Sequence, residues 1–110
     1  MVSPYFYQEI LMSEYAPIKS NTCTFSTVGD SDSSVTLLAS NSRRKGASIV
    51  NSSTAVLYVR MDGGAATTTT GYNIPLVQNG YFEVPFGYTG AITGIWASDA
   101  GGAANVAEYT

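Results

Sequence analysis

The sequence predicts an all-β fold, an antiparallel β-sandwich of about eight short strands with Greek-key or jelly-roll connections. Extended apolar segments recur roughly every 8–12 residues, and clusters of Gly, Asn, Asp and Ser separate them. The clearest segments alternate apolar with polar side chains, which is typical of strands that cover a core on one face. The chain has 110 residues, which suits one domain with one core. We therefore divide it into an N-terminal arm, residues 1–20, and a single β-sandwich domain, residues 21–110.

Each expected strand lies between two turn signals. In chain order, the strands are expected at residues 22–28, 34–39, 47–51, 54–61, 74–77, 81–86, 91–97 and 103–109, with a further β-branched run at 67–72. The sequence Asp62-Gly-Gly64 predicts a tight turn, because glycine accepts a positive φ. The pair Asn79-Gly80 predicts a type I′ hairpin turn.

The alternation also predicts which side chains form the core. In segment 54–61, the core-facing row consists of Ala55, Leu57, Val59 and Met61. In segment 91–97, Ile92 and Trp96 share one face, so we expect Trp96 to be buried.

Segment 81–86 has a proline near its end. Phe82, Val84 and Phe86 would point to one side. Pro85 cannot donate a ladder hydrogen bond, so this strand should lie at a sheet edge or end there.

Composition argues against several classes of function. The chain has no histidine and one cysteine, so we expect no catalytic residue, no cofactor and no metal site, and we do not expect an enzyme. A net charge of -3 argues against nucleic acid as a partner, and no apolar stretch is long enough to span a membrane. Asp30, Asp32 and Asp62 fall in turns, and Asp30-Ser-Asp32 lacks the glycine and glutamate of a calcium loop.

The N-terminal arm is unusually rich in bulky apolar side chains. They lie outside the regular strand pattern, so they would form an exposed patch unless something covers them. The arm either packs on its own sheet or binds a neighbouring molecule. As candidate interface residues we take Tyr5, Phe6, Tyr7, Ile10, Leu11 and Met12.

Two further features could contact a partner. Arg43, Arg44 and Lys45 hold three of the five positive charges and could bind an acidic patch, unless they form a solvated loop. Cys23 could form a disulfide between two copies of the chain, or it could be a buried thiol beside Phe25.

Part of the chain resembles a known class of protein. The residues that carry the resemblance are Arg44-Lys-Gly46, Ile49, Asn51, Ser53, Leu57-Tyr-Val59, the block Tyr81-Phe-Glu-Val-Pro-Phe-Gly-Tyr-Thr-Gly90 with Ile92 and Gly94-Ile-Trp96, and Val106-Ala-Glu-Tyr109. Together they resemble small accessory virion proteins of tailed bacteriophages over roughly residues 43–109.

The resemblance implies a structural role on a phage particle. It implies a head decoration (cement) protein on the phage head surface that binds the major capsid protein and stabilises the shell, working as a symmetric homo-oligomer such as a trimer. A tail or neck component of the same particle shares every feature cited. A small carbohydrate-binding module is the alternative from another class, and it would expose Tyr81, Tyr88 or Trp96 in a planar row.

Overall fold

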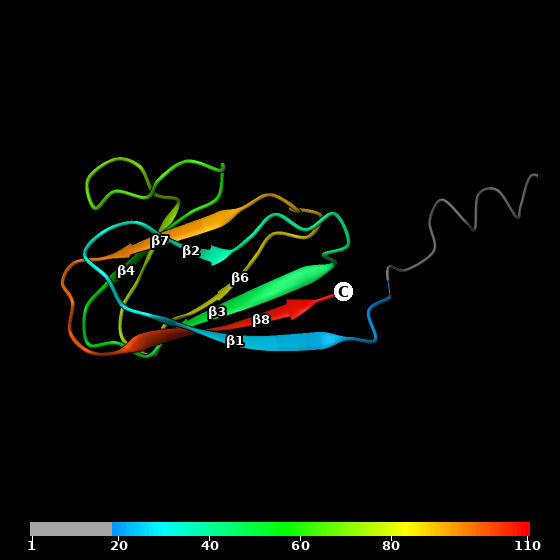
Figure 1. Cartoon of the computed structure of the whole chain (residues 1–110), viewed down its shortest axis with the longest axis horizontal. Coiled ribbons are helices and arrows are strands. Elements are labelled where there is room, and N and C mark those ends of the chain that lie inside the picture. Colours follow the sequence, from blue (N-terminus) through cyan, green and yellow to red (C-terminus); the bar gives the residue numbers. More distant parts are fainter. Residues whose placement is uncertain (1–18) are drawn as a thin grey trace, which may run out of the picture.

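The computed structural model describes residues 19–110, which form two four-stranded antiparallel sheets packed face to face (Figure 1). The strands are β1 (Cys23–Gly29), β2 (Val35–Leu38), β3 (Gly46–Asn51), β4 (Leu57–Arg60), β5 (Ile74–Leu76), β6 (Tyr81–Glu83), β7 (Ile92–Trp96) and β8 (Ala103–Tyr109). Within this part of the chain there is no helix, and so none that is long and apolar enough to cross a membrane.

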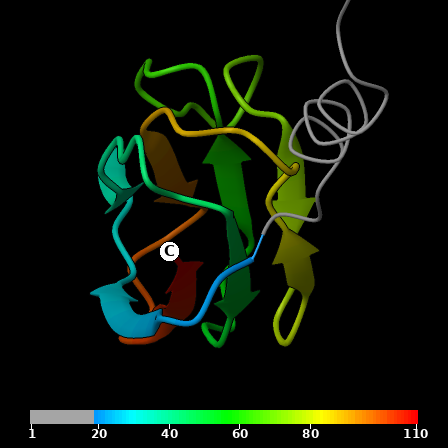
Figure 2. The same ribbon diagram turned by 90° about the vertical axis from the view of Figure 1, so that its right-hand side faces the viewer.

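The strand order confirms the predicted sandwich and its jelly-roll wiring. One sheet has the order β1-β8-β3-β6 and the other β2-β7-β4-β5. Every connection except β4 to β5 passes from one sheet to the other, and the view along the strands in Figure 2 shows the two layers that result. This double Greek key is the jelly-roll arrangement.

The core forms where the apolar rows of the two sheets meet. Ile49 and Val106 face inward from the first sheet, and Leu57, Ile92 and Trp96 face inward from the second; all five are essentially inaccessible to solvent. These positions alternate with outward-facing residues along each strand, as the sequence predicts for β4 and β7.

Gly94 lets two leucines pack over the middle of β7. A Cβ atom at this position would lie 2.9 Å from Cδ1 of both Leu37 and Leu57, closer than carbon atoms approach. The absence of a side chain here therefore allows β2 and β4 to flank β7 without a void.

Three local predictions are wrong. Residues 67–72 form an exposed loop, because the Thr67 hydroxyl accepts the N–H of Gly71 at 2.6 Å and folds the segment back on itself. Phe86 is 69% exposed, because the chain turns after Pro85, whose carbonyl accepts the Tyr88 N–H at 3.1 Å.

The third wrong prediction is the type I′ hairpin at Asn79-Gly80. Strands β5 and β6 belong to different sheets, so no hairpin joins them. The turn runs from Val77 to Gly80, and within it only Asn79 has a positive φ, of 65°, whereas a type I′ turn needs a positive φ at both central residues. Asn51 of β3 fixes this turn, since its carbonyl accepts the Asn79 N–H at 2.6 Å and its N–H donates to the Gly80 carbonyl at 3.0 Å. The prediction that this strand lies at a sheet edge is confirmed, although β6 ends at Glu83, two residues before Pro85.

The buried amide of Asn51 joins the two sheets. Its side-chain N–H groups donate to the carbonyls of Ala55 at 2.9 Å and Leu76 at 2.8 Å. Its oxygen accepts the Ser53 N–H at 3.1 Å and the Trp96 indole N–H at 3.0 Å. Because Asn51 lies in the first sheet and Leu76 and Trp96 lie in the second, one side chain satisfies polar groups from both layers.

We predict that Asn51→Leu lowers the free energy of unfolding by about 3 kcal/mol or more, because it leaves four buried polar groups without their partner. Urea unfolding followed through the fluorescence of Trp96, the single tryptophan, measures the change. The matched control is Asn105→Leu, at an exposed position, which should change stability by no more than about 0.5 kcal/mol. Equal effects at both positions would contradict the role given to Asn51.

Candidate functional site

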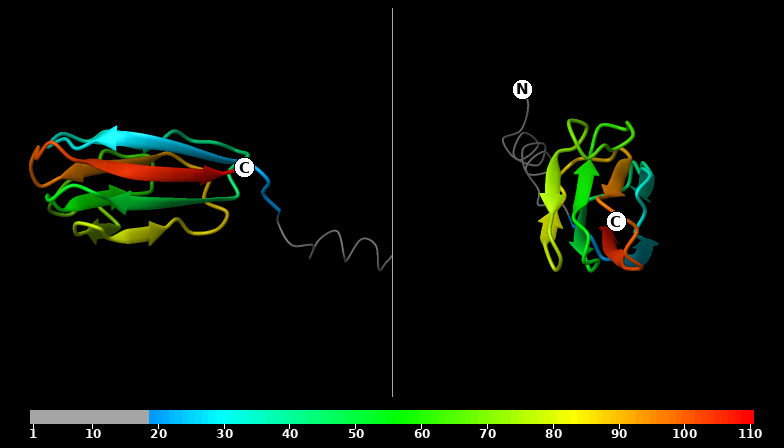
Figure 3. Two further views of the ribbon diagram at one scale, coloured as in Figure 1. Left: turned by 90° about the horizontal axis from the view of Figure 1, so that it is seen from below. Right: turned by 90° about the vertical axis from the view of Figure 1, so that its left-hand side faces the viewer.

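A shallow groove of about 420 Å³ lies on the outer face of the β1-β8-β3-β6 sheet. The left view of Figure 3 shows this sheet with β1 along one edge. The groove crosses β3 and β6 near the end of β8. Its lining residues are Lys45, Gly46, Ala47, Ser48, Tyr81, Glu83, Val84, Pro85, Phe86 and Tyr109.

Exposed aromatic side chains gather on this outer face. Phe86, Tyr81 and Tyr109 are 69%, 60% and 41% exposed, and all three line the groove. Phe25 on β1 is 80% exposed. A large aromatic side chain left in water forgoes the burial that stabilises it elsewhere, so four on one face mark this surface as a candidate for binding.

The strand register explains why these side chains share a face. Cys23 pairs with Tyr109, which pairs with Gly46, and residues directly opposite one another in a sheet point to the same side. Two positions along β1, Phe25 lies in the row of Ala107, Ser48 and Glu83. Tyr81 lies in the following row, so the aromatic groups span the sheet from β1 to β6.

Cys23 is exposed and lies beside the Tyr109 phenol. The charge and hydrogen bonding of Cys23, with smaller effects from burial, Tyr81 and Glu83, raise the pKa of Tyr109. The alternative of a buried thiol is therefore wrong: β1 is an edge strand, and the Cys23 side chain lies on its outer face. An intersubunit disulfide at Cys23 stays a prediction.

The three aromatic residues expected to form a sugar-binding row do not lie together. Trp96 is fully buried, as predicted, with its indole N–H bound to Asn51. Tyr88 is half-buried and donates its hydroxyl to the Ala91 carbonyl at 2.7 Å. Of the three, Tyr81 alone belongs to the exposed face.

The basic cluster divides between surface and interior. Arg43 is exposed and Lys45 lines the groove, but Arg44 is only 3% exposed. Its guanidinium forms an ion pair with Glu108 at 2.8 Å.

Arg44 also binds backbone carbonyls in the connection from β2 to β3 and in the connection from β6 to β7. It donates to Gly90 at 2.8 Å, to Ala39 at 2.5 Å and to Tyr88 at 3.3 Å. Arg44 is therefore a structural residue, which corrects its assignment as a candidate interface residue. The fork of guanidinium donors makes arginine suited to gathering several acceptors at one point.

Asp30 fixes the connection between β7 and β8. Its carboxylate accepts the Ser53 hydroxyl at 2.6 Å and the N–H groups of Gly102 at 2.8 Å, and of Ala100 and Gly101 at 3.2 Å. The Ser53 hydrogen bond, followed by those of the backbone, lowers the pKa of Asp30 against the opposing effect of desolvation. This turn aspartate therefore has a structural role.

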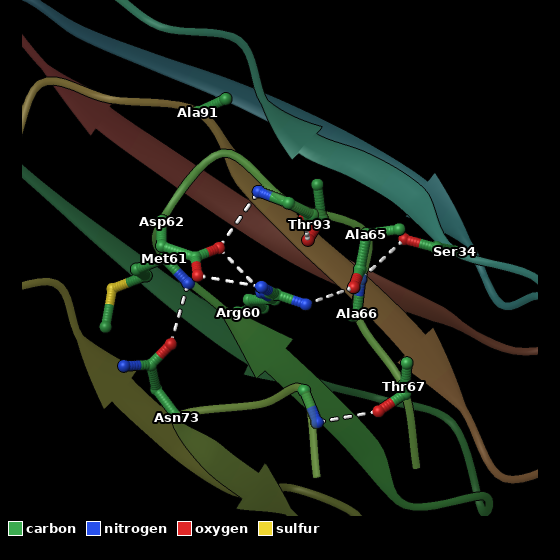
Figure 4. Close-up of polar contacts among 12 residues, drawn as sticks. Ser34, Arg60, Met61, Asp62, Ala65, Ala66, Thr67, Asn73, Ala91 and Thr93 are labelled. Atoms are coloured by element: carbon green, nitrogen blue, oxygen red, sulfur yellow. Dashed lines mark hydrogen bonds and ion pairs between the residues drawn. The ribbon is translucent and has the colours of Figure 1, made fainter. Parts of the chain in front are cut away.

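Figure 4 shows a second polar cluster at the end of β4. Arg60 binds both oxygens of Asp62, at 2.6 and 2.8 Å, and the Ala65 carbonyl at 2.8 Å. The Arg60 hydrogen bonds lower the pKa of Asp62 to about 2. The same loop is tied to its neighbours by Ser34, which accepts the Ala66 N–H, and by Asn73, which accepts the Met61 N–H. These contacts order the long loop that connects β4 to β5.

Other expected site residues lie outside the part of the chain that the structure describes. They are Tyr5, Phe6, Tyr7, Ile10, Leu11 and Met12. Within residues 19–110, no group of three or more His, Cys, Asp or Glu side chains is placed to hold a metal ion.

Sequence reasoning missed the exposed aromatic face. Alternation places Phe86 on the same side as Phe82 and Val84, and it places Phe25 beside a thiol that could be buried. The available signal was the absence of any bulky apolar residue next to Phe25 on its own strand, Cys23–Gly29, which is otherwise built from small residues and one valine.

We predict that Arg44→Met lowers the free energy of unfolding by about 3 kcal/mol, because Glu108 and three carbonyls lose their common donor. Urea unfolding measures the effect. Arg43→Met removes the same charge from an exposed position and should change stability by no more than about 0.5 kcal/mol. A stability loss of the same size in both variants would show that charge, and not the internal hydrogen bonds, is responsible.

We also predict that Asp30 makes the fold acid-sensitive. Its pKa is lowered in the folded state, so below about pH 4 the unfolded chain binds more protons and stability falls as the pH decreases. Asp30→Asn should reduce the slope of stability against pH between about pH 4 and pH 2, measured by urea unfolding at successive pH values. Ser53→Ala, which removes the shortest hydrogen bond to this carboxylate, should reduce the slope as well. Unchanged slopes in both variants would refute the prediction.

Comparison of the sequence with protein-family models and curated proteins, and of the structure with solved structures, finds no match.

Proposed function

We propose that this chain is a structural virion protein of a tailed phage, a decoration protein that binds the major capsid protein at the head surface and stabilises the shell. The observation that carries the proposal is the exposed aromatic face of the β1-β8-β3-β6 sheet, with the groove between Tyr81, Phe86 and Tyr109. The proposal assigns no catalytic step to the chain.

The make-up of this face supports binding to a protein surface. Tyrosine and phenylalanine are enriched in the buried centres of protein interfaces, where charged residues are depleted. Here Tyr81, Phe86 and Tyr109 lie around the groove. The charged residues that line it are Lys45 and Glu83. An apolar centre with one charge of each sign suits a complementary protein segment better than a highly charged partner.

The resemblance supports the choice of a phage particle. The block from Tyr81 to Trp96 holds groove residues as well as core residues, so the part of the sequence that resembles accessory virion proteins includes part of the candidate binding face. The jelly-roll fold is compatible with this assignment, since viral capsid domains use it, although lectins and cupins do as well. The fold is therefore supporting context and the site is the argument.

Binding would stabilise the head by linking neighbouring capsid subunits. Docking of an aromatic side chain into a fitted pocket contributes more than the surrounding polar contacts. Because many copies act on one shell, a modest affinity per copy is sufficient to resist expansion of the shell.

We predict that the double variant Tyr81→Ala/Phe86→Ala loses binding to phage heads. The full-length protein is mixed with heads that lack their decoration protein, and bound chain is measured by co-sedimentation. If these residues form the centre of the interface, the dissociation constant should rise at least about 30-fold. The matched control is Val77→Ala, an apolar residue that is 64% exposed and lies outside the groove, and it should bind as the unmodified chain does.

Three results would contradict the proposal. Failure of the unmodified chain to co-sediment with heads would remove the decoration role, and binding to isolated tails or necks would move the chain to that part of the particle. Binding to a glycan array that is lost with Tyr81→Ala would favour the carbohydrate-binding alternative, because an exposed tyrosine beside Glu83 could also stack on a sugar ring.

A further inference from the structure

The four sheet edges in the described part of the chain are not equally protected. Unpaired edge strands invite pairing with another chain, and natural proteins prevent it with short strands, prolines, charges or bulges. Strand β6 has three residues and is closely followed by Pro85, and β5 has three residues including Pro75. Strand β2 has four residues and an irregular register between Thr36 and Leu38.

Strand β1 has none of these protections. It runs for seven residues, Cys-Thr-Phe-Ser-Thr-Val-Gly, without a charged residue or a proline, and its register with β8 is continuous over all seven pairs. Six of its seven residues are exposed. Figure 3 shows β1 along the edge of its sheet.

The hydrogen-bond pattern shows which backbone groups of β1 point outward. The carbonyl of Thr22 accepts the Thr110 N–H, and the N–H of Asp30 donates to the Gly102 carbonyl, both at 2.9 Å. In an antiparallel ladder the bonded side alternates with each residue, so the even-numbered residues face β8. The N–H and C=O groups of Cys23, Phe25 and Thr27 therefore point away from the sheet.

We propose that two copies of this chain pair through β1, antiparallel about a two-fold axis, so that the two four-stranded sheets become one sheet of eight strands. With the axis at Ser26, Phe25 lies opposite Thr27 of the second copy, and Cys23 lies opposite Gly29 of the second copy. All seven residues are then paired. The outward-pointing groups of one copy meet those of the other, and both outer faces lie on the same side.

A second copy fits this edge for two reasons. Because β1 carries no charge, pairing it with itself places no like charges opposite one another. The two Phe25 rings become diagonal neighbours across the axis, about 7–8 Å apart between Cα atoms and within reach of aromatic side chains. The most exposed large apolar side chain of the described residues is thereby covered. The arrangement is closed, because each copy uses the same strand.

In this register the two Cys23 residues are too far apart to form the predicted disulfide. The two Cys23 residues would lie about 20 Å apart, six residues along the strand, whereas the Cα atoms of a disulfide lie within about 7 Å. The dimer should therefore persist in reductant. The inference concerns the free chain and does not depend on binding to heads.

Light scattering coupled to size exclusion tests the proposal on the full chain, in reductant, over a dilution series. We expect a mass of twice one chain. Thr27→Pro removes an N–H that points away from β8 and blocks the edge, so the dimer dissociation constant should rise at least about 30-fold. Thr27→Ala is the matched control and should dimerise as the unmodified chain does. A monomeric unmodified chain, or a Thr27→Pro variant that dimerises normally, would overturn the proposal.

A second pair of variants tests the register and does not depend on the folding of the proline variant. Ser26→Lys and Ser26→Glu each place like charges opposite one another at the axis, and each should dimerise more weakly than the unmodified chain. An equimolar mixture should recover dimer, because it places opposite charges there. If the mixture recovers no dimer, the two strands do not pair about Ser26. If the unmodified dimer disappears in reductant, Cys23 and not β1 pairing holds it together.

Discussion

The sandwich depends on polar contacts at the two ends of β3. At one end, the Asn51 amide receives or donates four hydrogen bonds and joins the two sheets. At the other end, Arg44 precedes the strand. It binds Glu108, a carbonyl of the connection from β2 to β3 and a carbonyl of the connection from β6 to β7. The apolar core supplies most of the burial, but it is not directional. These two side chains specify how the sheets are aligned, because each buried donor has its acceptor in one arrangement only.

The pattern of the sequence was sufficient for the architecture and insufficient for the connections. Strands alternate with period two, so β4 and β7 and their core rows follow from Leu57, Val59, Ile92 and Trp96. Loops obey local hydrogen bonds that periodicity does not encode. The β-branched run at residues 67–72 is a loop because the Thr67 hydroxyl competes for backbone N–H groups.

The same limit explains the candidate site. The sequence groups Arg44 with its charged neighbours, since nothing in a run of three basic residues reveals that one of them forms an ion pair with Glu108 of β8. The exposed aromatic face could not be predicted either, because it depends on the register that places Cys23, Tyr109 and Gly46 in one row. Several residues that carry the resemblance, including Asn51 and Trp96, are internal, so that part of the resemblance reflects the fold more than the binding surface.

The groove and the strand proposed for self-association belong to the same sheet, the groove on its outer face and β1 at its edge. Pairing about an axis perpendicular to that sheet keeps both outer faces on the same side, so a dimer would present two grooves to a single surface. A capsid offers repeated copies of one binding site, and two linked contacts raise the apparent affinity far above that of one, provided that the spacing of the sites matches. Phe25 would lie near the axis between the two grooves, where its ring helps to hold the copies together. In this arrangement the low charge of the chain has a physical purpose, because a neutral edge and a neutral face can each pair without repulsion.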